Sequence, residues 1–388
     1  MLLAGARRVN STRILLAEPD RHLATVYGES LAAMGFHTFV AENGESVVRM
    51  LSEVQPRAVV LDLVQPALDA SRVIRSIREN KATRTVPILG LPTELASLAR
   101  DALDSGATKV LERFAHPLAA LVNAVTAAIG PELVTAGAQE PPPAQNAEVR
   151  QRSQAELANR LAPLRQCLQA LSQQPGNASG FRGLLQQVHA CTELAALLQH
   201  RPVFQMAASL ETLVFDLCEI PEQINPSILR TLGQGIDLLH SLINRQPPAE
   251  DADRVASKVM VVDDDANSRQ LIAAALQLVQ LPSATAATPA AALEALVASP
   301  ADLIFLDVGL PEINGFQLCT KIRALPMHEH TPIVFLTGMA TFQNRVQSSL
   351  SGGNDFIGKP FNLRELGLKA LTWIAKGTPG KTLATAAA

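Results

Sequence analysis

The chain alternates between short runs of Val, Ile and Leu and longer segments with an apolar residue every three or four positions. Apolar runs without a polar residue at every second position are typical of strands buried on both faces of a sheet, and the longer segments are typical of amphipathic helices. In the C-terminal third this pattern predicts a parallel sheet with helices on both faces. The expected strands span 258–262, 302–306, 332–336 and 355–358, with a weaker one at 283–287, and the expected helices span 267–279, 289–298, 315–324, 341–350 and 362–375.

An internal repeat connects the two ends of the chain. Ile14 overlays Val259 at an offset of 245 residues, and the same offset aligns four further landmarks without a gap. We therefore interpret the two ends as copies of one domain type. The further landmarks are Val59–Asp62 on Ile304–Asp307, Pro66 on Pro311, Ile77 on Ile322 and Pro87 on Pro332.

The middle of the chain, residues 151–245, contains no strand pattern. Its apolar residues step by three and four in four segments, around Leu164, Val188, Leu210 and Leu232, which predicts four amphipathic helices and their closure into a four-helix bundle. Proline-rich stretches at 131–150 and 246–257 are typical of linkers. We therefore expect three domains, at 11–130, 151–245 and 258–376.

Composition narrows the classes of function. The 33 Lys and Arg nearly balance the 36 Asp and Glu, so no basic surface is predicted for nucleic acid. The 4 Cys lie far apart without a CxxC pair, which argues against a zinc site or a disulfide framework. No signal peptide and no apolar window of membrane-spanning length is recognised. These features predict a soluble, cytoplasmic protein that does not enter a membrane.

Polar residues gather where the C-terminal strands are expected to end. Asp263 and Asp264 follow the first strand and Asp307 ends the third, while Thr337 and Lys359 follow the last two. Carboxyl ends of parallel strands meet at one edge, and three carboxylates placed together would repel one another without a cation. Oxygen ligands of this kind suit Mg²⁺. One carboxylate can then act as a nucleophile towards a phosphoryl group, with the lysine and the hydroxyl stabilising the transition state.

These residues, with the segment Val308–Gly315 after the central aspartate, resemble the receiver domain of two-component response regulators over residues 258–376. The resemblance implies a flavodoxin-like α/β fold with a parallel five-stranded sheet. It also implies that Asp307 is the phosphoacceptor and that Asp263, Asp264 and Asp307 bind Mg²⁺ with the backbone carbonyl of Gly309. Thr337 and Lys359 would transmit phosphorylation, and Phe356 takes the place of the family's switch aromatic.

Residues 11–130 resemble the same family but lack much of its chemistry. Asp62 keeps the acceptor position and Glu18 matches Asp263. Pro19 replaces the principal metal-binding aspartate, Pro92 replaces the switch threonine and Arg113 replaces the lysine. Proline offers neither a ligand nor a hydroxyl. We therefore expect a pseudo-receiver used for binding or dimerisation, with Asp62 as a degenerate acceptor candidate.

His189 is the candidate for chemistry in the middle domain. At 100° per residue it lies about 120° from the centre of the apolar stripe of its helix, so we expect an exposed side chain open to a docking partner. With Leu210 and Glu211 at the family's spacing, the segment resembles a histidine phosphotransfer domain, particularly that of chemotaxis kinases. It departs from the family at Thr192 and Glu193, where Lys and Gly are usual. A competent transfer domain, a degenerate bundle for docking and an unrelated bundle all remain open.

The leading hypothesis is a bacterial-type response regulator that receives a phosphoryl group on Asp307 from a histidine kinase or a phosphotransfer protein and switches contacts with a downstream protein. One alternative is a multistep relay through His189. The others are an adaptor that never passes phosphate on and a regulatory portion of a removed enzymatic output domain. Beyond the receiver's own phosphorylation and dephosphorylation no enzyme activity is expected, and a homodimer remains open.

Overall fold

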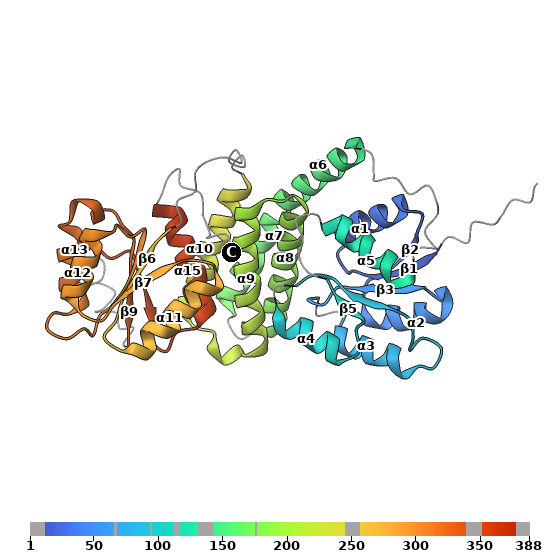
Figure 1. Ribbon diagram of the computed structural model, residues 1–388, viewed down its shortest axis with the longest axis horizontal. Helices are drawn as coiled ribbons and strands as arrows, with labels where there is room; N and C mark the ends of the chain where they lie inside the picture. The colour runs from blue at the N-terminus through green and yellow to red at the C-terminus, as the bar shows by residue number, and fades with distance from the viewer. Residues whose placement is uncertain are drawn as a thin grey trace, which may run out of the picture. The chain divides into compact units, whose positions relative to one another are not determined.

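The computed structural model describes residues 12–65, 68–93, 95–111, 117–130, 143–174, 177–244, 257–338 and 351–377. Backbone contacts group these residues into two compact units. The first contains the described residues up to Arg160 together with Gln186–Arg201, and the second contains Leu161–Leu185 together with the described residues from Pro202 onward. Each unit contains one of the two sheets (Figure 1).

The N-terminal domain is a parallel sheet of five strands in the order β2-β1-β3-β4-β5. Every residue of β3 is buried, because helices cover both faces of the sheet. Helices α1 and α5 pack together on one face, and α2, α3 and α4 form a row on the other (Figure 1). The elements are β1 (Arg13–Ala17), α1 (Arg21–Ala33), β2 (His37–Ala41), α2 (Gly44–Val54), β3 (Ala58–Leu61), α3 (Ala70–Glu79), β4 (Ile88–Gly90), α4 (Ala96–Asp104), β5 (Lys109–Val110) and α5 (Pro117–Ile129).

The C-terminal domain repeats this topology, with the strand order β10-β9-β8-β6-β7. In both sheets the first strand along the chain lies between the second and the third, which is the flavodoxin-like order. The prediction of two parallel five-stranded α/β sheets is confirmed. The expected helix at 341–350 lies outside the described residues. The elements are β6 (Val259–Val262), α11 (Ala266–Leu278), β7 (Ser283–Ala286), α12 (Pro289–Ala298), β8 (Leu303–Asp307), α13 (Gly315–Arg323), η3 (Pro326–His328), β9 (Ile333–Thr337), β10 (Asp355–Gly358) and α15 (Leu363–Gly377).

The region between the sheets in the sequence is helical, as predicted, whereas closure into a four-helix bundle stays a prediction. None of the helices in the described part of the chain is long and apolar enough to cross a membrane. The elements are α6 (Pro143–Asn159), α7 (Leu161–Gln173), α8 (Ala178–Leu197), α9 (Arg201–Glu219), η2 (Pro221–Gln223) and α10 (Pro226–Ile243).

Two local predictions in this region were wrong. The expected linker 131–150 is helical from Pro143, because proline is tolerated in the first helical turn and the Ala, Gln and Glu residues that follow favour a helix. The segment around Leu164 was expected to be one helix from Leu157 to Leu171, whose apolar residues step by four and three, but the helix is interrupted at Arg160 between α6 and α7. Pro163 lacks the N–H group that would continue the hydrogen-bond ladder from α6.

In the second unit, α10 packs against both α7 and α15. The buried carboxylate of Glu365 on α15 accepts hydrogen bonds from the hydroxyls of Ser227, at 2.6 Å, and Thr231, at 3.0 Å. Arg364 adds an ion pair to Asp216 on α9 at 3.7 Å. Helix α15 therefore joins the C-terminal sheet to the helical region through polar as well as apolar contacts.

Candidate functional site

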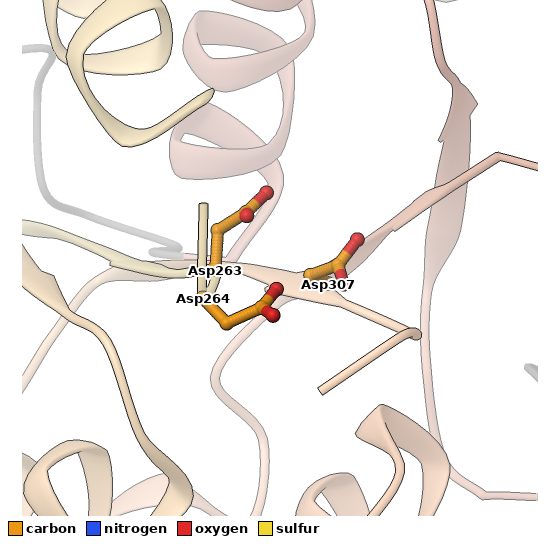
Figure 2. Close-up of side chains that lie close together, drawn as sticks. All are labelled: Asp263, Asp264 and Asp307. Carbon is orange, nitrogen blue, oxygen red and sulfur yellow. The ribbon is translucent and has the colours of Figure 1, made fainter. Parts of the chain in front are cut away.

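Three carboxylates lie together at the carboxyl edge of the C-terminal sheet. Asp307 is the last residue of β8, and Asp263 and Asp264 directly follow β6. Strands β6 and β8 are parallel neighbours that pair Val262 with Leu306, so their ends meet. One ligand oxygen from each of the three aspartates lies within 4.8 Å of the others. Figure 2 shows the three side chains close together. Asp263 and Asp307 are buried, whereas Asp264 is exposed.

Lys359, which follows β10, supplies positive charge to this cluster. Its Nζ donates to Asp263 Oδ2 at 2.7 Å and lies 2.8 Å from Asp307 Oδ1. Burial raises the pKa of Asp263, although the lysine opposes that effect. Burial also disfavours the charged lysine, but the hydrogen bonds to Asp263 and Asp307 outweigh it and raise the pKa of Lys359. The ammonium therefore partly neutralises the two buried carboxylates.

Backbone groups complete the setting of Asp307. The N–H of Gly309 donates to Asp307 Oδ2 at 2.8 Å. Gly315 begins α13 beside the backbone carbonyl of Asp307, and a β-carbon at Gly315 would collide with that carbonyl. The close start of α13 therefore requires glycine and places a helix directly behind the end of β8.

Two further predicted residues lie on the neighbouring strands. Thr337 ends β9, is buried, and its carbonyl accepts a hydrogen bond from the N–H of Lys359 at 2.7 Å. Phe356 lies on β10 and is half-buried, with the guanidinium carbon of Arg230 from α10 at 4.7 Å from the ring centre. The structure thus brings Thr337 and Lys359 to one edge and places Phe356 against the helical region.

A buried ion pair at the start of β10, the end of that strand away from the acidic cluster, was missed from the sequence. Lys369 on α15 lies 2.8 Å from Asp355 Oδ2, and the indole of Trp373 also donates to that oxygen at 3.2 Å. Burial alone would raise the pKa of Asp355, but the charge and hydrogen bond of Lys369 lower it below its ordinary value. The helical spacing of Lys369 and Trp373 placed them on one face, but no sequence signal identified the carboxylate they share.

The carboxyl edge of the N-terminal sheet is also acidic but is arranged differently. Glu18 and Asp62 are 1% exposed, and Asp62 Oδ1 accepts the N–H of Val64 at 2.9 Å. Burial and the charge of Asp62 raise the pKa of Glu18 well above its ordinary value. Within the described residues only the Asp263, Asp264 and Asp307 cluster gathers three potential metal ligands, so this edge has no equivalent. Pro92 follows β4 and is half-buried, and Arg113 lies outside the described residues.

The predicted exposure of His189 was wrong. Its side chain is 2% exposed, and Nε2 lies 3.4 Å from Asp62 Oδ1. The helical wheel correctly separates His189 from the apolar stripe, but the N-terminal domain covers that flank of α8. The structure thus brings His189 and Asp62 together, a pairing that was not predicted from the sequence.

Residues 259–371 match the family model of the response regulator receiver domain. The transcriptional regulatory protein SrrA of Staphylococcus aureus is 34% identical over 115 residues, which are 30% of this chain and 46% of SrrA. Among solved structures, the chemotaxis response regulator CheY4 of Vibrio cholerae is 30% identical and covers 31% of this chain and 99% of its own, with a TM-score of 0.30. A two-component response regulator from Clostridium difficile is 28% identical and covers 31% and 97%, with a TM-score of 0.29.

Residues 259–371 are therefore a receiver domain of the two-component response regulators. The chain spans less than half of SrrA, so the likeness concerns the receiver part alone. Receiver domains of this family bind Mg²⁺ through an acidic pocket and interact with histidine kinases or phosphotransfer proteins. The cluster of Asp263, Asp264 and Asp307 lies inside the matched residues.

Proposed function

We propose that the C-terminal domain accepts a phosphoryl group on Asp307 and thereby switches protein contacts. The observation that carries this proposal is the convergence of Asp307, two further carboxylates and Lys359 at one edge of the sheet. A loose phosphoryl transition state needs an in-line nucleophile with positive charge and N–H donors around it. Asp307 is the nucleophile in this proposal, with Lys359 as the cation and the Gly309 amide as a donor.

The donor set fits Mg²⁺. Its side-chain ligands are carboxylate oxygens from two buried aspartates and one exposed aspartate, and oxygen is what this hard cation prefers. Asp263, Asp264 and Asp307 would hold the ion together with the backbone carbonyl of Gly309. When bound, Mg²⁺ neutralises part of the charge of the carboxylates and of the incoming phosphoryl oxygens. Exposed Asp264 leaves the cluster accessible from solvent.

The donor is a phosphohistidine of a histidine kinase or a phosphotransfer protein. An oxygen of Asp307 forms a bond to phosphorus while the P–N bond of a phosphohistidine that carries a proton on its other ring nitrogen breaks, and the electron pair of that bond returns to the imidazole nitrogen. Lys359 stays within reach of the acceptor, where its ammonium stabilises the charge on the transferred oxygens. The product is an aspartyl phosphate and a neutral imidazole.

The switch would involve Thr337 and Phe356. Thr337 ends the strand next to Asp307, so its hydroxyl is a suitable donor to a phosphoryl group on that residue. Phe356 lies on the following strand against Arg230 of α10. A shift of Thr337 towards the phosphate would therefore alter the packing of Phe356 and the surface that a downstream protein meets.

Phosphorylation with radiolabelled acetyl phosphate and Mg²⁺ tests the assignment of the acceptor. We expect label on the wild type and a fall to background in Asp307→Asn, since the amide is not a nucleophile. Asp62→Asn is the matched control, because it makes the same change at the other sheet and should keep the label. Label that survives in Asp307→Asn, or that disappears in Asp62→Asn, contradicts the proposal.

For the rest of the chain we favour a binding role over a multistep relay. In this proposal residues 11–130 act as a pseudo-receiver and residues 151–245 as a bundle related to phosphotransfer domains. The burial of His189 against Asp62 supports it, because a relay histidine has to meet its donor in solvent. Label that is stable in base and labile in acid is typical of phosphohistidine. If such label were found on the wild type and lost in His189→Gln, it would instead support the relay.

A further inference from the structure

Helix α8 is buried on all sides along part of its length. Every residue from Val188 to Ala195 is buried, which covers two full turns. An amphipathic helix at a bundle surface exposes one face, so continuous burial requires a second covering surface. The buried stretch includes the polar residues His189, Thr192 and Glu193. Residues 186–201 accordingly belong to the compact unit of the N-terminal domain.

The covering surface is the carboxyl edge of the N-terminal sheet with helix α1. Asp62 approaches His189 at 3.4 Å. One turn further along α8, Glu193 Oε2 accepts the hydroxyl of Tyr27 from α1 at 2.8 Å. All four side chains are at most 3% exposed, so this contact excludes water from the polar face of α8.

Charges at the end of α6 match the same acidic edge. Arg160 lies 2.7 Å from Asp20 Oδ2 and from Glu156 Oε1, and its side chain is 15% exposed. At the solvent rim, Arg152 of α6 pairs with Glu29 of α1 at 2.6 Å. A basic residue thus meets an acidic one both in the centre and at the rim of the contact.

We propose that the N-terminal domain is a built-in cap that docks on α6 and α8 and holds His189 out of reach of other molecules. The contact itself leaves no space for chemistry at the imidazole. A transferred phosphoryl group lies in line between donor and acceptor atoms, and phosphorus is about 3 to 3.5 Å from the attacking atom. The 3.4 Å between Nε2 and Asp62 Oδ1 cannot contain it. The cap must open before His189 can react.

Modification of the full chain with diethyl pyrocarbonate tests the cap, because this reagent acylates imidazoles that solvent reaches. Peptide mapping by mass spectrometry gives a rate for each histidine. His330 is exposed and His328 is buried within the C-terminal domain, so the two provide internal references. We expect modification of His189 to be at least about tenfold slower than that of His330, since it needs local opening.

Charge reversal at the rim identifies what covers His189. Glu29 and Arg152 are 46% and 42% exposed, so Glu29→Arg or Arg152→Glu changes the contact without disturbing either core. Each single variant should increase the rate at His189 several-fold, and the double variant should restore the slow rate. Arg165→Glu, which alters an exposed pair outside the contact, is the matched control and should change nothing.

Several outcomes would overturn the cap. These are a wild-type rate at His189 equal to that at His330, single reversals without effect, and an increase that the double variant does not reverse. Circular dichroism and the rate at His328 report whether a variant is folded. If a reversal unfolds the chain, Asp62→Asn serves as the second variant, because it keeps the side-chain shape and should still accelerate modification of His189.

Discussion

The carboxyl edges of the two sheets hold acidic side chains in matching places. The basic residues that lie near these carboxylates come from different parts of the chain. In the C-terminal sheet the cation is Lys359, which follows a strand of the same sheet, and Asp264 stays exposed. In the N-terminal domain Arg160, which follows α6, pairs with Asp20 at the start of α1, and His189 of α8 lies against Asp62. The same topology therefore supports an edge open to ions and an edge closed by its own chain.

The two aspartates at the ends of the third strands have different surroundings, although they occupy matching places in the two sheets. Asp62 and Asp307 both follow the third-strand pattern and both are buried. Among the described residues, Asp307 has a lysine and two further carboxylates around it, and Asp62 has no such group of three. Asp62 instead has a buried oxygen, Oδ2, that accepts no hydrogen bond from the described residues. The two edges therefore differ in the surroundings of the carboxylate rather than in its presence.

Among the changes that test this comparison, removal of Arg160 should lower the stability of the protein most. Arg160→Gln leaves the carboxylate of Asp20, which is 4% exposed, without its cation. Breaking a buried pair from one side costs about 3 kcal/mol, which we expect in urea unfolding of the full chain. Arg152→Gln removes an exposed pair of similar length and should hardly shift the transition. Equal effects of the two substitutions would show that the buried pair does not hold the closed edge.

Removal of the Tyr27 hydroxyl should cause the next largest loss of stability. Tyr27→Phe leaves buried Glu193 without this donor, and the loss of a hydrogen bond to a charged group costs roughly 1.5 to 3 kcal/mol. Thermal unfolding measures the change. Ser30→Ala is the control on the same helix, since the Ser30 hydroxyl donates within the helix to the backbone carbonyl of Val26 and alanine favours a helix. A Tyr27→Phe protein as stable as the Ser30→Ala protein would rule out a stabilising role for this contact.

Metal affinity should distinguish the open edge from the closed one. Asp264→Asn removes an exposed ligand without disturbing the core, and we expect Mg²⁺ binding to weaken by at least about tenfold, since even outer-shell substitutions cost that much. Trp373 is the only tryptophan and lies in the C-terminal domain, so its fluorescence provides a readout alongside calorimetry. Asp62→Asn should leave the affinity unchanged. Similar losses from both substitutions would place the ion elsewhere.

The smallest effect concerns the pH dependence of stability. Burial and the charge of Asp62 raise the pKa of Glu18 above 4.5 in the folded state, so the folded protein holds a proton that the unfolded chain releases. Stability should therefore decrease as the pH rises from 4.5 towards the folded pKa. Glu18→Gln should lessen that decrease and unfold at a higher temperature than the wild type at neutral pH.

Because Asp62, Asp20 and His189 also act on Glu18, the relevant quantity is the difference between variant and wild-type curves. Glu53→Gln changes an exposed glutamate of the same domain and should leave the curve as it is. A Glu18→Gln curve parallel to that of the wild type over the whole range would mean that Glu18 does not hold the proton.

The C-terminal site could be predicted from the sequence because its information is local. Each polar residue follows an apolar strand run, and parallel strands bring their carboxyl ends to one edge, so Asp263, Asp307 and Lys359 had to converge. The repeat indicated that the two ends share one fold, and the flavodoxin-like sheet was implied by the family resemblance. The sequence pattern did not predict that the ammonium of Lys359 contacts both Asp263 and Asp307.

The cap over His189 could not be predicted, because it depends on contacts between segments far apart in the sequence. The apolar period of α8 describes one buried face and says nothing about what covers the other. Tyr27 and Arg160 carried no motif, and their partners Glu193 and Asp20 lie on other elements. Pro163 indicated that the helix could be interrupted before α7, but the apolar residues keep their helical spacing on both sides of the interruption.

The contact between Arg230 and Phe356 has a consequence for any downstream partner. Both residues belong to one chain and one compact unit, so their encounter is intramolecular. A contact within one chain is favoured over the same contact between separate molecules, because its two groups are already held together. A separate protein that binds Phe356 has to displace Arg230 of α10 from the ring. A partner with low affinity for Phe356 would therefore bind only after the contact between Arg230 and Phe356 has opened.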